Sequence, residues 1–244
     1  RNKGAFVSPR IKCRKGAGRG ISVINTFGLD IVAPDIEMWG NRQAITVGCQ
    51  NAGVPSNTDA IAIIGGQIHR LSQTADARVV SLTSDKANTL FVRNVSVSGL
   101  KVRSFGAYTS SVVATDVTGS LSLTDLRVEH GGADTSGTLD IRGCDDVSVV
   151  GGSLTGTITF GNGGTTPLAR VLGTRLGSAM IGTSAVTKLL GSSNSGDSST
   201  SPVGDVLRAG ASIGAATTEE TAITINGAVV GDAVLVSHTN PANI

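Results

Sequence analysis

A short phrase recurs along this chain, in which two apolar residues alternate with other residues and a turn residue then precedes an aliphatic one. The clearest copies span residues 95–100 and 121–126, and related copies span 63–68 and 149–154. Because successive side chains of a strand point to opposite faces, each phrase predicts a short strand with one apolar face that ends in a turn.

The last aliphatic residue of each copy marks the repeat. Two weaker copies extend the series, so the spacings are 39, 32, 26, 28 and 22 residues between the anchors Leu29, Ile68, Leu100, Leu126, Leu154 and Leu176. Spacings of this size are typical of solenoid repeats. A turn-forming residue type precedes the anchor in four copies, namely Gly28, Gly99, Asp125 and Ser153.

A second apolar stretch follows the anchor in three copies, at Val80 and Leu82, at Val112 and Val113, and at Leu139 and Ile141. Each repeat therefore holds at least two strands and is predicted to form one coil of a parallel β-helix, an all-β solenoid with about six coils. An antiparallel β-sandwich is the alternative fold, because short strands every 8 to 12 residues or so also predict it. The anchors recur only after a full multi-strand unit, which favours the β-helix.

Composition agrees with an all-β protein. The 244 residues are 39% hydrophobic, enough for a core, while 33 glycines and only 3% aromatic residues favour short strands and tight turns. The chain has no apolar run of about 18 residues and no leader of the secretory type, so no membrane insertion is expected. Three widely spaced cysteines, Cys13, Cys49 and Cys144, support neither a disulfide framework nor a CxxC metal site.

Charge and small-residue content suggest the domain boundaries. Residues 1–20 hold seven basic residues and no acidic one, which predicts a basic N-terminal arm, and the body from 21 to 190 is predicted to be the β-helix. The Ser/Gly-rich segment 191–205 has the composition of a linker. Two predicted strands within 222–236 indicate a small β-module over 206–244 that is incomplete at Ile244. The start at Arg1 instead of Met is expected of a fragment or a processed product.

The C-terminal region carries a resemblance to a known group of proteins. Residues 223–236 read Ile-Thr-Ile-Asn-Gly-Ala-Val-Val-Gly-Asp-Ala-Val-Leu-Val after the stretch Ser212-Ile213-Gly214-Ala215-Ala216, and this resembles a segment of tailed-phage virion proteins. The preceding repeats resemble the right-handed β-helix of phage tailspikes and of the pectate-lyase-like superfamily. The two resemblances imply a homotrimer in the virion, at the exterior of the tail or capsid, with other virion proteins as partners.

Three functions remain open from this resemblance. The first is a structural and adhesive tail fibre or tailspike, which presents loops 104–110, 130–138 and 161–167 to the host surface. The second is a tailspike that depolymerises host cell-surface polysaccharide as a glycoside hydrolase or lyase. The third is a head fibre or capsid decoration protein, which differs only in location.

An enzyme of that kind needs paired carboxylates, one as an acid and one as a base or nucleophile. Glu129, His130 and Asp134 are the best catalytic candidates, at the exit of a predicted strand. Asp35 and Glu37 beside Trp39 form a second group, in which Trp39 could stack on a sugar, although packing of Trp39 over the end of the β-helix is favoured. Asp145 and Asp146 are adjacent and are interpreted as turn formers. Tyr108, the only tyrosine, is a further binding candidate.

Other chemistry is weakly supported. The glycines within 16–20 lack the dinucleotide fingerprint, and the three histidines show no metal-ligand spacing, so no cofactor and no metal are expected. Nucleic-acid binding is disfavoured, because the basic N-terminus is short and holds only Phe6 for base stacking.

Overall fold

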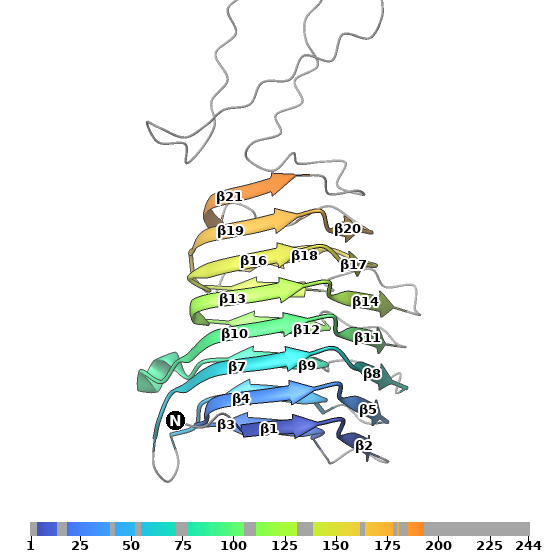
Figure 1. The fold of residues 1–244 in the computed structure, drawn as a ribbon. Helices are drawn as coiled ribbons and strands as arrows, with labels where there is room; N and C mark the ends of the chain where they lie inside the picture. Colours follow the sequence, from blue (N-terminus) through green and yellow to red (C-terminus); the bar gives the residue numbers. More distant parts are fainter. Residues whose placement is uncertain are drawn as a thin grey trace, which may run out of the picture.

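A computed structural model shows the chain as a stack of parallel strands (Figure 1). It describes residues 4–13, 19–39, 42–51, 55–71, 78–104, 111–130, 139–161, 164–177, 180 and 185–192. Every pairing between named strands is parallel and joins strands of successive coils. The all-β, parallel β-helix prediction is therefore confirmed, and the antiparallel β-sandwich is wrong.

The strands form three sheets. Sheet A holds β1 (Gly4–Val7), β4 (Phe27–Val32), β7 (Thr58–Ile64), β10 (Val92–Ser98), β13 (Thr118–Thr124), β16 (Asp146–Val150), β19 (Thr166–Leu172) and β21 (Val186–Ser192). Sheet B holds β2 (Arg10–Cys13), β5 (Asp35–Met38), β8 (Gln67–Arg70), β11 (Lys101–Ser104), β14 (Arg127–His130), β17 (Ser153–Leu154) and β20 (Arg175–Leu176). Sheet C holds β3 (Ile21–Ile24), β6 (Ile45–Gly48), β9 (Val80–Thr83), β12 (Val112–Thr115), β15 (Leu139–Arg142) and β18 (Ile158–Phe160).

One coil runs through sheet A, then sheet B, then sheet C, so a coil contributes three strands and not only two. A short 3-10 helix, Lys86–Asn88, follows β9. The first coil begins inside the segment predicted as a basic arm, because β1 pairs with β4 and β2 pairs with β5. Sheet B has seven strands, one for each coil, compared with the six coils expected from the sequence.

Aliphatic side chains stack in columns inside the coils. In sheet A, Ile61, Val95, Leu121 and Val147 occupy one register position on successive strands, and each is at most 1% exposed. Burying one such side chain stabilises the fold by roughly 1.5–3 kcal/mol, and the neighbouring coil supplies the burial. The alternation in the recurring phrase is therefore the inward and outward alternation of sheet A.

In the two clearest copies the turn residue of the phrase, Gly99 or Asp125, lies at the corner between sheets A and B, whereas Gly28 lies within β4 and Ser153 begins β17. The backbone at this corner is left-handed in every coil, with φ between 48° and 65° at Ser8, Ala33, Gly65, Gly99, Asp125, Gly151 and Gly173. Glycine, Asp and Asn adopt this conformation at least cost, which explains the predominance of glycine. The backbone amides of Gly65, Gly99 and Asp125 still donate to the next coil, at 2.6, 2.9 and 2.8 Å.

The predicted anchors do not share one structural position, which corrects the repeat derived from the sequence. Leu100 and Leu126 lie directly after the corner, where the other coils have Gly66 and Gly152, as the hydrogen bonds of Lys101 N to Gly66 O and of Ser153 N to Leu126 O establish. The anchors Ile68, Leu154 and Leu176 instead occupy the first inward position of sheet B, and Leu29 lies in sheet A. Where Gly66, Gly152 or Thr174 takes the place of the leucine directly after the corner, the next aliphatic residue is two positions further on.

The second apolar stretch of each repeat is sheet C, as the repeat analysis expected. Val80, Val112 and Leu139 occupy one register position, and Leu82, Ala114 and Ile141 occupy the next inward one. The inward pair in β12 is therefore Val112 and Ala114. Val113 takes the register position between them, on the outer face.

The predicted linker 191–205 and C-terminal module 206–244 lie outside the described residues, apart from the end of β21. Among the described residues, none belongs to a helix with the length and apolar character needed to cross a membrane.

Candidate functional site

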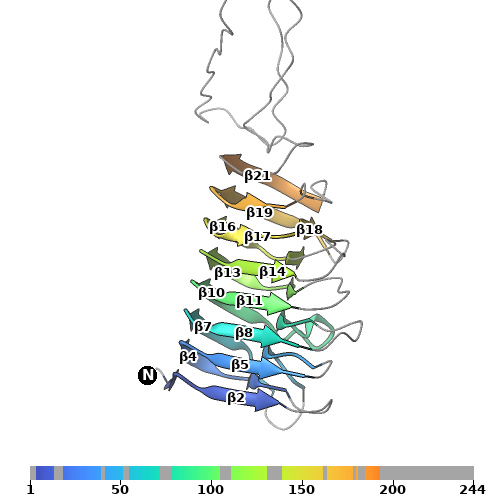
Figure 2. The same cartoon turned by 90° about the vertical axis from the view of Figure 1, so that its right-hand side faces the viewer.

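Charged side chains are concentrated on the outer face of sheet B, which Figure 2 turns toward the viewer. Its inward residues are aliphatic for most of its length, so the outward residues form two columns along the stack. The first column is Arg10, Asp35, Gln67, Lys101, Arg127, Ser153 and Arg175. The second column is Lys12, Glu37, His69, Arg103 and Glu129. Neighbouring residues in a column are about 4.8 Å apart, the spacing of paired strands.

The first two coils of this face pair their charges. Arg10 Nε lies 3.7 Å from Asp35 Oδ2, and Lys12 Nζ lies 3.4 Å from Glu37 Oε2. Trp39 Nε1 donates a hydrogen bond of 2.9 Å to Glu37 Oε1, and the Trp39 side chain is 50% exposed. Trp39 thus lies at the surface beside β5, whereas packing over the end of the stack was expected. Its indole is oriented by Glu37 and open on one side.

The same pairing determines the ionisation of Glu129. Arg103 Nε donates to Glu129 Oε2 at 2.6 Å, and Lys101 Nζ lies 3.4 Å from Oε1. The hydrogen bond from Arg103 lowers the pKa of this carboxyl below the ordinary value for glutamate, with Lys101 adding to the effect. A general acid needs a raised pKa to hold its proton near neutral pH. The pKa of Glu129 is shifted in the opposite direction.

No second carboxylate joins Glu129 on the described part of sheet B within catalytic range. Glu37 is in the same column but three strands away, about 14 Å, whereas glycosidase carboxylates are roughly 5–9.5 Å apart. His130 ends β14 opposite Ser104, but its side chain is not among the described ones. Asp134, Tyr108 and most of the three predicted binding loops lie outside the described residues.

The adjacent pair Asp145 and Asp146 is divided between two structural roles. Asp145 Oδ2 accepts a hydrogen bond of 3.1 Å from the backbone amide of Gly119 in the preceding coil. Asp146 begins β16 and pairs with Arg170 of the next coil at 2.5 Å. Both carboxylates therefore tie successive coils together, and of the two residues interpreted as turn formers Asp145 lies in the bend before β16 whereas Asp146 is already in the strand.

Two buried polar residues escaped the sequence reasoning. Arg70 occupies the inward position of β8 between Met38 and Ser104 and is 1% exposed. Arg70 lies two residues after the inward Ile68 in the same strand, and this spacing alone predicts that its side chain points inward. Asp140 is buried on sheet C, where its carboxylate pairs with Arg142.

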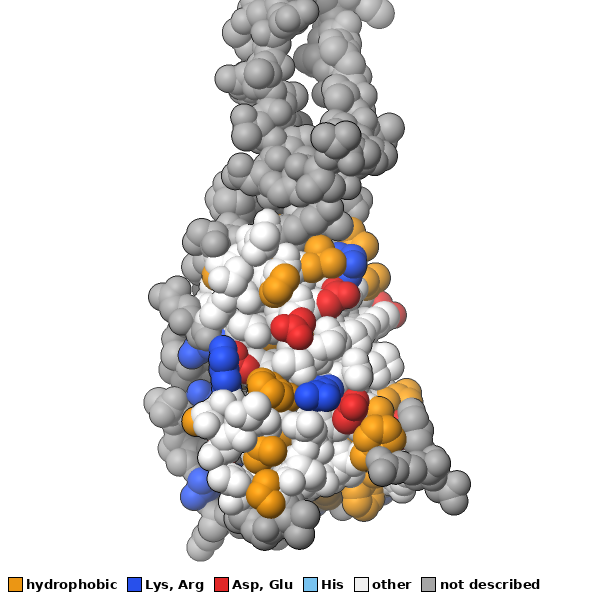
Figure 3. All heavy atoms as spheres, turned by 90° about the vertical axis from the view of Figure 1, so that its left-hand side faces the viewer, with side chains coloured by type: hydrophobic (Ala, Val, Ile, Leu, Met, Phe, Trp, Pro, Cys, Tyr) orange, Lys and Arg blue, Asp and Glu red, His pale blue; other side chains and the backbone are white. Residues whose placement is uncertain are grey.

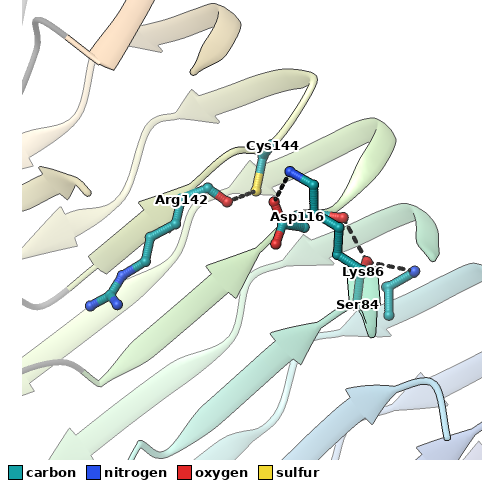
Figure 4. A network of polar contacts seen from close by, with 6 residues as sticks. Ser84, Lys86, Asp116, Arg142 and Cys144 are labelled. Carbon is teal, nitrogen blue, oxygen red and sulfur yellow. Dashed lines mark hydrogen bonds and ion pairs between the residues drawn. The ribbon is translucent and has the colours of Figure 1, made fainter. Parts of the chain in front are cut away.

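Cys144 belongs to a polar network at the corner between sheets C and A (Figure 4). Its thiol donates weakly to Arg142 O at 3.6 Å, and burial raises its pKa to about 11. Nearby, Lys86 pairs with Asp116 at 3.5 Å, and Ser84 Oγ donates to Asp116 O at 2.6 Å. A buried thiol with a raised pKa is chemically inert, so this network supports the turn and not a reaction.

The upper coils of sheet B differ from the lower ones in charge balance. Lys101 and Arg103 share Glu129, while Arg127 and Arg175 are exposed and make no ion pair or side-chain hydrogen bond with any described residue. A shallow depression of about 390 Å³ lies beside Lys101 and is lined also by Arg10, Asp35 and Gln67. On the opposite side of the molecule, charges of both signs are scattered among polar and apolar side chains (Figure 3). The cationic character of sheet B is therefore not shared by the opposite side of the molecule.

Sequence reasoning missed this set of cations because they are spread over the chain. The available signal was the position of each one, at the second or fourth residue after the corner residue of its coil.

Among the described residues, no group of three His, Cys, Asp or Glu side chains is arranged to hold a metal ion. Comparison with known proteins found no protein family, curated protein or solved structure that matches this chain.

Proposed function

We propose that this protein is a structural and adhesive virion protein of a tailed phage, a trimeric tail fibre or tailspike that attaches to the host surface. The observation that carries the proposal is the combination of a stiff parallel β-helix with the phage-like phrase in residues 212–236. Stacked coils hold their backbone groups in hydrogen bonds to neighbouring coils, which suits a part exposed to shear and protease.

The charge arrangement favours attachment over catalysis. Glu129 is held ionised by Arg103, and Glu37 is too distant to act with it. Three further described carboxylates, those of Asp35, Asp140 and Asp146, are also ion-paired to basic residues. A surface that presents fixed charges along a rigid stack is suited to binding an extended ligand.

Two measurements test the proposal. Light scattering of the full chain in solution is expected to give three times its 24.5 kDa mass. Antibody-gold labelling of phage particles that carry the chain is expected to mark the tail. A monomer, or a chain that is absent from particles, would overturn the proposal, and label on the head would assign the chain to capsid decoration instead.

The enzymatic alternative is tested separately. The full chain is incubated with capsule or O-antigen polysaccharide, and new reducing ends are counted for the wild type and for Glu129→Gln. We expect no sustained turnover from either. Turnover by the wild type that Glu129→Gln abolishes would establish a depolymerase.

A further inference from the structure

The strongest unexplained feature of the molecule is the excess positive charge on coils four to seven of sheet B. Lys101, Arg103, Arg127 and Arg175 face solvent there, and Glu129 is the only acid among the described residues of the same strands. Like charges on neighbouring strands repel one another, so the arrangement has an intrinsic cost in the free chain. A bound anion would remove that cost.

The geometry of these cations is linear. Lys101 and Arg127 are one strand spacing apart, about 5 Å, and Arg127 and Arg175 are two spacings apart, about 10 Å. Ser153 lies between the two arginines with a hydroxyl that can donate or accept. A ligand that follows this column is an extended chain with repeated anionic groups and with hydroxyls between them.

Glu129 fixes part of this set. Its carboxylate accepts from Arg103 at 2.6 Å and lies 3.4 Å from Lys101, so both side chains are held against the sheet with donors to spare. The shallow depression beside Lys101 continues the face toward the lower coils, where Gln67 and Arg10 line it. Lys101 and Arg103 are therefore positioned before a ligand arrives, which reduces the entropy that these two side chains lose on binding.

The chemistry of the face favours an acidic glycan over a nucleic acid. Strands β11, β14, β17 and β20 contain no Phe, Tyr or Trp on which bases could stack. Four cations offset by one carboxylate would neutralise few phosphates. Proteins that bind a nucleic-acid backbone commonly neutralise many. The arginines can pair with the carboxylates of an acidic glycan, and Ser153 can form a hydrogen bond with its hydroxyls.

We propose that the outer face of sheet B in coils four to seven binds an acidic, carboxylate-bearing polysaccharide that lies along the β-helix axis. The inference rests on the proposed attachment function and names the class of ligand for it. Arg127 and Arg175 contact the carboxylates, Lys101 extends the same column, and Arg103 lies beside it in the second column.

The test compares binding of the full chain to immobilised alginate, a carboxylated glycan, with binding to dextran, a neutral one, at low salt. The key variant is Arg127→Gln with Arg175→Gln. The matched control is Arg42→Gln with Arg93→Gln, which removes the same charge from exposed residues outside sheet B. A single-stranded oligonucleotide serves as a second polyanion.

We expect binding to alginate but not to dextran, a roughly tenfold weaker affinity for the key variant, and little change for the control. Added salt is expected to weaken binding. Equal binding to dextran, equal loss in both double variants, no binding to alginate, or tighter binding of the oligonucleotide with the same dependence on Arg127 and Arg175 would each overturn the inference. A chain that is trimeric and present in the tail but fails this test would keep the proposed function and lose the ligand assignment.

Discussion

At the scale of single residues, position within the coil decides what each charged side chain does. Glu129 and Asp146 are both acidic residues in strands, and each is neutralised by a basic residue from a neighbouring strand. Glu129 is not prepared to donate a proton, because its ion pair with Arg103 stabilises the ionised form and lowers its pKa. Arg127 and Arg175, which pair with no acidic residue in the described part of the chain, are by contrast available to a ligand.

The ionisation of Glu129 can be measured directly. Because Arg103 lowers its pKa in the folded state, the ion pair stabilises the fold above the pKa of Glu129 in the unfolded chain, and this stability is lost as the pH falls through the lower folded value. We expect an NMR titration to give Glu129 a midpoint below that of an ordinary glutamate, and Arg103→Gln to raise it. An unchanged midpoint in Arg103→Gln would show that the ion pair does not form in solution.

Two glycines distinguish backbone strain from steric clash. Gly152 and Gly173 both have positive φ, at 78° and 61°, but a Cβ on Gly152 would lie 2.2 Å from Leu126 O, whereas nothing lies within 4 Å of one on Gly173. We expect Gly173→Ala to lower the free energy of unfolding by about 1–2 kcal/mol, the cost of the left-handed backbone. Gly152→Ala adds the clash and is expected to cost clearly more in urea denaturation. Equal losses would contradict the close approach at Gly152.

At the scale of elements, the strands of sheet A such as β13 contribute one face to the core and the other to the outside of the stack. In β13, Leu123 faces inward and is 1% exposed, and its neighbour Ser122 faces outward. Each inward residue packs against its equivalents in the strands above and below. Its contribution to the stability of the fold therefore depends on the neighbouring coils and not on its own strand alone.

This difference predicts unequal effects of truncation within one strand. We expect Leu123→Ala to reduce the free energy of unfolding by about 2–5 kcal/mol, because it leaves a cavity between coils. The matched control Ser122→Ala is expected to change it by less than about 0.5 kcal/mol. The measurement is chemical denaturation of the full chain, and similar losses for both variants would contradict the assigned orientation of β13.

At the scale of the whole molecule, the stack is quasi-one-dimensional. Central strands such as β10 have a partner on both sides, whereas β1 pairs with β4 alone among the described strands. Protection from exchange depends on how many neighbours must separate before an amide opens. Stability is therefore expected to fall from the middle of the stack toward its first coil.

Hydrogen exchange measures this gradient. We expect amides of β10 and β13 to exchange slowest and those of β1 to exchange fastest. Identical protection from β1 to β13 would show that the stack opens as one unit.

Much of the architecture was predictable because strand alternation is a local property. The inward residues of β10 and β13 follow from the period of two alone, and the corner at Gly99 and Asp125 follows from residue type. The equivalence of Leu100 with Ile68 did not hold, because Gly66 occupies the position of Leu100 and Ile68 occupies that of Val102, and no single copy of the phrase reveals this.

The sequence by itself determined the fold class, since the inward residues and corner turns are written in short-range patterns. It also supplied the candidates Glu129 and Trp39, because rare or charged residue types stand out in an otherwise small-residue chain. Only the tertiary structure decided what they do: the stacking of strands brings Arg103 to Glu129 and aligns Lys101, Arg127 and Arg175 from three coils. Parallel pairing places residues more than 20 positions apart about 5 Å from one another, and local patterns do not contain that register.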